Sequence, residues 1–87
     1  MYLKDYGPYV EVFSDGTKHY YVHGQLHRLD GPAIEYPGGD KCYYLHGQLH
    51  RTDGPAIEYS NGQKSYYVHG IYYSTKELWA QAVKELS

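Results

Sequence analysis

The sequence contains only one cysteine, Cys42, among its 87 residues. An internal disulfide is therefore excluded, and this cysteine usage is typical of a reducing compartment. Apolar runs are short, and none approaches the roughly 20 residues that a membrane-spanning helix needs. The first residues, Met1 to Asp5, lack the basic and apolar segments of a secretory signal peptide. These absences predict a cytoplasmic protein with no membrane association.

Positive charge is also scarce, since 8 Lys and Arg stand against 10 Asp and Glu, for a formal net charge of −2. General binding to nucleic acid relies on clustered Lys and Arg that displace counterions from phosphates, so the balance argues against it. Tyrosine, by contrast, is abundant: there are 13 Tyr beside one Phe and one Trp. A tyrosine ring offers a large contact area and keeps a polar hydroxyl, so such a domain can be part core and part binding surface.

The dominant feature is internal repetition with a 23-residue period, which the even spacing of Gly24, Gly47 and Gly70 displays. The segment 18–36 recurs with few changes as 41–59. The sequence therefore predicts a single domain over 1–87 that is divided into five parts. These are a partial repeat (1–14), two full repeats (15–37 and 38–60), a partial repeat (61–73) and a C-terminal helix (74–86).

Each unit reads as short strands separated by turns. Residues 18–23 are rich in β-formers and predict a strand, and His23-Gly24-Gln25 predicts a turn. Short strands are expected at 26–28 and 33–36, separated by the breaker Asp30-Gly31-Pro32. Because side chains alternate across a strand, five positions of the unit and their counterparts one repeat on are expected in the core. These are Tyr20, Val22, Leu26, Ile34 and Tyr36.

The pattern changes near the C-terminus. Ser74-Thr75-Lys76-Glu77 matches a capping box with Ser74 as the N-cap. The apolar residues that follow have helical spacing, which places them on one face packed over the last hairpin. They are Leu78, Trp79, Ala82, Val83 and Leu86. The predicted fold is mainly β: tandem 23-residue hairpin repeats form a twisted antiparallel sheet with one C-terminal amphipathic helix.

The two blocks from Leu26 to Ala33 and from Leu49 to Ala56 share the pattern Leu-His-Arg-x-Asp-Gly-Pro-Ala. With the 23-residue spacing, this pattern resembles the MORN repeat, in particular a degenerate variant common in phages, large viruses and bacteria. The resemblance covers about residues 7–73, and Arg28 and Arg51 stand where that family usually has glycine. It implies a β-hairpin stack for protein–protein contact, in a bacterial or phage-infected cell. In that setting, a role as inhibitor of a host defence protein is expected.

The strand face opposite the expected core repeats a tyrosine and a histidine in each unit. Tyrosine and arginine dominate the hot spots of protein interfaces, so these columns predict a protein-binding surface with the arginines at its rim. The predicted binding residues are Tyr21, His23, Tyr44, His46, Tyr67, His69, Arg28 and Arg51.

The repeated histidines also suggest a metal site, because His23 and His27 lie four residues apart, as do His46 and His50. A Gly turn separates each pair, however, and no further ligand completes a tetrahedral set within one unit. Hydrogen bonding beside the turns is the favoured interpretation. No metal and no cofactor are expected.

The Arg28-x-Asp30 and Arg51-x-Asp53 patterns have two interpretations. An arginine oriented by aspartate could grip a carboxylate or phosphate with two hydrogen bonds. Alternatively, the aspartate caps the Asp-Gly-Pro turn, and the arginine pairs with Asp30 or Glu35. The structural interpretation is favoured because the pattern sits at a turn in each full repeat.

Catalysis is not expected. Glu35 and Glu58 occupy one slot of successive repeats and predict a surface row rather than an acid–base pair, and a lone Cys42 is more typical of an inert thiol. No motif combines a nucleophile, a base and an oxyanion site. Besides protein binding, two other functions are considered. One is an oligomeric sponge that holds a nucleotide or similar anion between tyrosine rings and Arg28 and Arg51; the other is a structural homo-oligomer.

Overall fold

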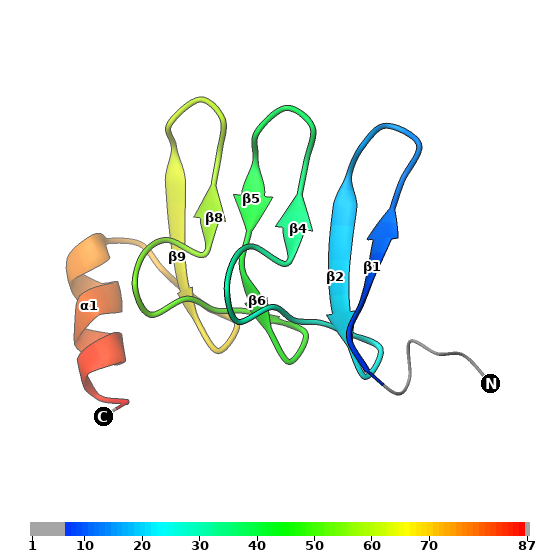
Figure 1. The fold of residues 1–87 in the computed structure, drawn as a ribbon. Coiled ribbons are helices and arrows are strands. Elements are labelled where there is room, and N and C mark those ends of the chain that lie inside the picture. Colours follow the sequence, from blue (N-terminus) through cyan, green and yellow to red (C-terminus); the bar gives the residue numbers. More distant parts are fainter. Residues whose placement is uncertain (1–6, 87) are drawn as a thin grey trace.

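The computed structural model describes residues 7–86 as a row of hairpins with a helix at its C-terminal end (Figure 1). The part of the predicted first repeat in residues 1–6 lies outside the described residues. In chain order the elements are β1 (Tyr9–Val12), β2 (Lys18–Val22), β3 (Gln25–Leu26), β4 (Ile34–Glu35), β5 (Lys41–Cys42), β6 (Tyr44–Leu45), β7 (Gln48–Leu49), β8 (Ile57–Glu58), β9 (Lys64–Val68), β10 (Ile71–Tyr73) and α1 (Lys76–Lys84).

In the described part of the chain, eight strands form one antiparallel sheet in the order β1-β2-β4-β5-β8-β9-β10, with β3 attached to β2. Strands β6 and β7 pair separately. The prediction of a mainly β antiparallel fold with a C-terminal helix is confirmed. The short strands are shorter than predicted, because Asp30-Gly31-Pro32 delays the start of β4 until Ile34 and the tip of the hairpin begins at Tyr36.

Three long hairpins, β1-β2, β4-β5 and β8-β9, end in tips of the same construction. In each tip an aromatic residue donates its backbone N–H to the carbonyl four residues on: Phe13 to Thr17, Tyr36 to Asp40 and Tyr59 to Gln63, at 2.8 to 3.0 Å. The third residue after each aromatic is a glycine with positive φ, at 96°, 109° and 92° in Gly16, Gly39 and Gly62. The tips therefore place three aromatic residues, from equivalent positions of successive units, at the same end of the sheet (Figure 1).

At the opposite end of the strands, two-residue His-Gly turns reverse the chain. His23 and Gly24 have φ of 51° and 77°, and closely similar values recur at residues 46–47 and 69–70. Positive φ at both central residues is what a type I′ turn requires, and this turn matches the right-handed twist of the flanking strands. For a residue other than glycine, this region costs about 1–2 kcal/mol. The histidines at these positions are thus held in a strained backbone conformation.

The two faces of the sheet differ. We call the side that carries Tyr20, Tyr43 and Tyr66 the loop face, because the loops after β3 and β7 and the helix α1 pack against these rings. The adjacent residues Tyr21, Tyr44 and Tyr67 point to the other side, since successive side chains alternate across a strand. We call that side the tyrosine face.

The core is small. Within residues 7–86, the buried hydrophobic side chains are Ala33, Ile34, Ala56, Val68 and Trp79. Of the predicted core residues, Ile34 is buried, whereas Tyr20, Val22 and Leu26 are half-buried. The prediction was wrong for Tyr36 and its counterpart Tyr59, which are 43% and 38% exposed. They stand at the hairpin tips, beyond the layer formed by the loops and the helix.

The helix begins one residue later than predicted. The N-cap is Thr75 rather than Ser74: Thr75 is extended (φ −132°, ψ 154°), and its Oγ1 accepts a hydrogen bond from the N–H of Leu78 at 3.1 Å. Trp79 anchors α1 and is buried, while Ala82 and Val83 are half-buried. Leu78 and Leu86, which were predicted on the packed face, are exposed because the helix contacts the sheet along a narrow stripe.

Candidate functional site

Each of the two repeated loops is fixed by an arginine. Arg28 Nε lies 3.1 Å from Asp30 Oδ1, and its Nη1 donates to the carbonyl of Pro32 and to Glu35 Oε2, at 3.1 and 3.2 Å. The guanidinium carbon stands 3.8 Å from the centre of the Tyr20 ring, in cation–π geometry. One side chain therefore connects its own loop to strand β4 and to strand β2.

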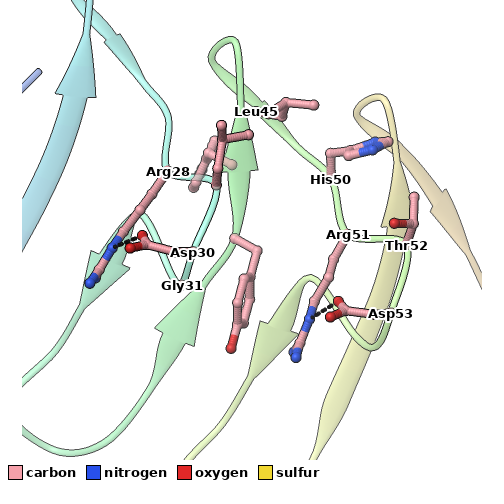
Figure 2. Close-up of a pocket in the computed structure, with 11 residues that line it drawn as sticks. Arg28, Asp30, Gly31, Leu45, His50, Arg51, Thr52 and Asp53 are labelled. Carbon is pink, nitrogen blue, oxygen red and sulfur yellow. Dashed lines mark hydrogen bonds and ion pairs between the residues drawn. The ribbon is translucent and has the colours of Figure 1, made fainter.

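Arg51 repeats the arrangement one unit later (Figure 2). It pairs with Asp53 at 2.8 Å, donates to the Pro55 carbonyl and Glu58 at 3.1 and 3.2 Å, and lies 3.9 Å above the Tyr43 ring. The predicted pairing of the arginines with aspartate and glutamate is confirmed.

Glycine follows each of these aspartates for a steric reason. A Cβ on Gly31 would lie 3.2 Å from the guanidinium carbon of Arg28, and a Cβ on Gly54 would lie 2.9 Å from that of Arg51. Any side chain at these positions displaces the arginine. The Asp-Gly pair thus both holds the guanidinium group and leaves room for it.

A cleft of about 490 Å³ lies between the two loops and is lined by residues of both (Figure 2). The arginines at its sides are each paired with an aspartate and a glutamate, so each cluster carries one positive and two negative charges. The positive charge of each guanidinium group is therefore balanced by carboxylates of the protein. A bidentate contact with an anion needs two neighbouring N–H donors of one guanidinium group. Nε and Nη1 are already hydrogen-bonded within the protein, so neither arginine has such a pair of donors free.

The C-terminal helix completes the cover of the loop face. Trp79 packs on Tyr66 with ring centroids 5.0 Å apart, and its Nε1 donates to the backbone carbonyl of Arg51 at 2.9 Å. The three tyrosines Tyr20, Tyr43 and Tyr66 are therefore covered in turn by Arg28, Arg51 and Trp79.

The tyrosine face is formed at its N-terminal end by rings that pack on one another. Tyr9 stacks on Tyr21 with centroids 4.9 Å apart and planes inclined by 13°. His19 Nδ1 lies 3.1 Å from the Tyr21 hydroxyl, and Phe13 packs against His19 at 4.7 Å. Burial raises the pKa of Tyr21, and the nearby carboxylate of Glu11 raises it further. The hydroxyl is therefore kept in its neutral form.

The face continues across the centre of the sheet. Burial raises the pKa of Tyr44, with smaller electrostatic contributions from Cys42, Tyr36 and Tyr67. Tyr67 contacts Tyr72 of β10 with ring centroids 5.5 Å apart, and Tyr72 itself is 57% exposed. Aromatic side chains thus extend over the face from β1 to β10.

Charged side chains of the strands are concentrated on the loop face. Lys18 opposes Glu35, Glu35 opposes Lys41, Lys41 opposes Glu58 and Glu58 opposes Lys64. The corresponding row on the tyrosine face, one position along, consists of His19, Ile34, Cys42, Ile57 and Ser65. Among the described strand residues, Glu11 on the edge strand β1 is the one carboxylate on the tyrosine face. Just before β5, the carboxylate of Asp40 lies near enough to Cys42 to raise the pKa of its thiol further, after burial. The strands of this face therefore carry little charge, and Asp40 adds one carboxylate near the tips.

The histidines link successive units. The backbone N–H of His46 donates to Nδ1 of His27 at 2.9 Å, and that of His69 donates to Nδ1 of His50 at 2.8 Å. The rings of these pairs lie 4.6 and 4.2 Å apart. Burial, followed by the neighbouring histidine, lowers the pKa of His27 and of His50. An accepting Nδ1 must be unprotonated, so the hydrogen bond and the lowered pKa agree.

The structure separates the predicted binding residues into three places. Tyr21, Tyr44 and Tyr67 lie on the tyrosine face. The arginines lie on the loop face, and His23, His46 and His69 lie exposed at the turns between strands. Sequence reasoning missed the exposed aromatic residues of the tips, Phe13, Tyr36 and Tyr59. Their even spacing along the chain was a signal that could have identified them as a column.

Comparison of the chain with family models, with curated proteins and with solved structures gives no match. Within residues 7–86, no group of three or more His, Cys, Asp or Glu is placed to hold a metal ion. The helix of the described chain is too short and too polar to cross a membrane.

Proposed function

We propose that this chain is a tandem MORN-like repeat protein that acts as a non-catalytic protein-binding module through its tyrosine face. The observation that carries the proposal is the asymmetry of the sheet. Arg28, Arg51 and Trp79 cover the loop face, whereas the other face carries part-exposed aromatic side chains at both ends and along the tips, around a central row of small, apolar and imidazole side chains.

The composition of the tyrosine face supports protein recognition. Tyrosine rings contribute large contact areas with little loss of side-chain entropy, and they are enriched in interface hot spots. Tyr21 and Tyr67 are held by ring contacts with Tyr9 and Tyr72, so these rings are ordered before a partner arrives. The polar hydroxyl groups at their tips supply hydrogen bonds.

The polar groups of the chain support binding rather than catalysis. Glu35 and Glu58 are each paired with an arginine, so neither is available as a free acid or base. Burial raises the pKa of the Cys42 thiol, which favours the unreactive protonated form. The internal pairing of Arg28 and Arg51 also weighs against a sponge that binds anions.

The test compares two double variants with the same change of charge. Tyr36→Arg/Tyr59→Arg places two charges on exposed side chains of the tips, while Leu29→Arg/Thr52→Arg places two on exposed side chains of the loops. The two substitutions of each variant occupy equivalent positions of successive units. Tagged wild type and both variants are used to capture proteins from a bacterial lysate, and the affinity for each captured protein is then measured with purified components.

A partner of the tyrosine face is expected to bind the wild type and Leu29→Arg/Thr52→Arg (the loop variant) with the same affinity. It is expected to bind Tyr36→Arg/Tyr59→Arg (the tip variant) at least about tenfold more weakly. Circular dichroism of the purified variants verifies that both are folded. If every partner binds the tip variant as tightly as the wild type, the proposed surface is wrong.

A further inference from the structure

We infer that the partner of the tyrosine face is a second copy of this chain, which packs face to face across a two-fold axis. The inference rests on the proposed function and assigns the occupant of the same surface. It is argued from the layering of the chain, the charge of the face and its area.

Within residues 7–86, the eight-stranded sheet has a second layer, the loops and the helix, on only one side. Its smallest extent is 17 Å, which accommodates the sheet and the covering loops. Domains bury the apolar side of a sheet against another layer, and two sheets pack face to face about 10 Å apart. Among the described residues, no large side chain is fully buried. A second tyrosine face supplies the layer that the single chain does not have.

The charge distribution favours a copy of the same face. In a two-fold interface the same patch meets itself, so any concentration of one charge would meet the same charge. The Lys18, Glu35 and Lys41 row lies on the loop face, and the corresponding positions on the tyrosine face, His19, Ile34 and Cys42, include no carboxylate or ammonium group. Two carboxylates border the face. Glu11 stands on the edge strand β1, and Asp40, beside a hairpin tip, accepts a hydrogen bond from the Ser60 N–H at 2.7 Å.

The area is sufficient. The two longer extents of the whole chain, helix included, are 42 and 30 Å, dimensions that leave room for the roughly 800 Å² per partner of a standard stable interface. The aromatic side chains also reach the borders of the face. Phe13, Tyr36 and Tyr59 stand along the tips, and Tyr72 lies on the last strand. Contact between two such faces therefore buries aromatic side chains along its borders and the Ile34, Cys42 and Ile57 side chains at its centre.

Sedimentation equilibrium of the full chain, from micromolar to submillimolar concentrations, measures the association. The wild type is expected at twice the chain mass of 10.1 kDa. Tyr36→Arg/Tyr59→Arg brings like charges into the interface and raises the dissociation constant by about 100-fold or more. The matched Leu29→Arg/Thr52→Arg variant, with the same added charge on the loop side, keeps the dissociation constant of the wild type.

Three outcomes overturn the inference: a monomeric wild type at every concentration, a dimer that tolerates the tip substitutions, or a dimer broken equally by the loop substitutions. If the tip variant does not fold, Tyr72→Arg replaces it, because that side chain is 57% exposed at the end of the same face. A monomeric chain that still binds another protein through Tyr36 and Tyr59 rejects the second copy as occupant and leaves the proposed function intact.

Discussion

Both faces of the sheet carry a tyrosine from each hairpin, but only the tyrosines of the loop face are covered by side chains of the loops and the helix. Tyr20 and Tyr21 are neighbours in the sequence, as are Tyr43 and Tyr44. The guanidinium group of Arg51 covers the Tyr43 ring at 3.9 Å, whereas the side chain of Tyr44, the next residue of the strand, points to the opposite side of the sheet. Residue type alone therefore does not determine whether a tyrosine of this sheet is covered or open. This is set by the segment that crosses the adjacent surface.

The largest expected effect on stability comes from the helix that covers the loop face. Trp79→Ala removes the ring packed on Tyr66 and the hydrogen bond to the Arg51 carbonyl. Loss of a buried tryptophan is expected to lower the free energy of unfolding by about 3–5 kcal/mol. Urea denaturation measures the effect. Leu78→Ala on the exposed side of the same helix serves as the control, and an equal loss in both variants would show that α1 does not seal the sheet through Trp79.

The second test compares the loss of a covered tyrosine of the loop face with the loss of an exposed tyrosine at a hairpin tip. Tyr43→Ala removes a ring that is packed under Arg51, and we expect a loss of about 2–4 kcal/mol. Tyr36→Ala removes a ring that is 43% exposed at a tip, and we expect a loss below about 1 kcal/mol. Both values come from thermal or urea unfolding at low protein concentration. Equal losses would contradict the assignment of covered and open faces.

A third, smaller effect on stability concerns the close contact between Gly54 and the guanidinium group of Arg51. In Gly54→Ala the new Cβ would lie 2.9 Å from the guanidinium carbon of Arg51, so the side chain must shift and its bonds to Asp53 and Glu58 weaken. We expect a loss of about 1–2 kcal/mol in unfolding free energy. Gly38→Ala is the matched control, because a Cβ there meets nothing within 4 Å. A harmless Gly54→Ala would mean that Arg51 does not fasten the loop.

The smallest effect is a pH dependence at the contacts between units. The pKa values of His27 and His50 are lowered in the folded chain, so the unfolded chain takes up protons first as the pH falls. Their contribution to stability is complete above the ordinary histidine pKa of about 6.5 and decreases as the pH falls from there toward the lowered values.

Urea unfolding at a series of pH values measures this slope. His27→Asn/His50→Asn retains a side-chain oxygen that accepts from the His46 and His69 N–H groups and does not titrate, so the slope is expected to flatten. His19→Asn is the control on the tyrosine face. An unchanged slope in the double variant would assign the pH dependence to other groups.

The sequence predicts the strands and turns well because their causes are local. Gly, Asp and Pro stand where the chain reverses, and Lys18–Val22 is rich in β-formers. The pairing of Arg28 with Asp30 and Glu35 was also within reach, since all three lie in one short segment. The shift of the N-cap from Ser74 to Thr75 reflects two adjacent residues of similar capping strength.

The division of the tyrosines between the faces was not predictable from alternation alone. Alternation assigned Tyr36 to the core as if its strand extended through it, but β4 ends at Glu35 and the tip projects past the covering layer. Which face the loops cross depends on contacts distant in sequence, such as Trp79 with Arg51. The expected binding residues therefore fell on both sides of the sheet.

The backbone contacts between successive hairpins have a consequence for the length of the chain. The N–H of Arg28 donates to the carbonyl of Tyr44, and that of Arg51 donates to the carbonyl of Tyr67, at 3.3 and 3.2 Å. A further unit of 23 residues, inserted between these hairpins, would carry an arginine N–H that donates to the following unit and a tyrosine carbonyl that accepts from the preceding one. The molecule could thus be lengthened by whole segments, with Trp79 still closing whichever one comes last.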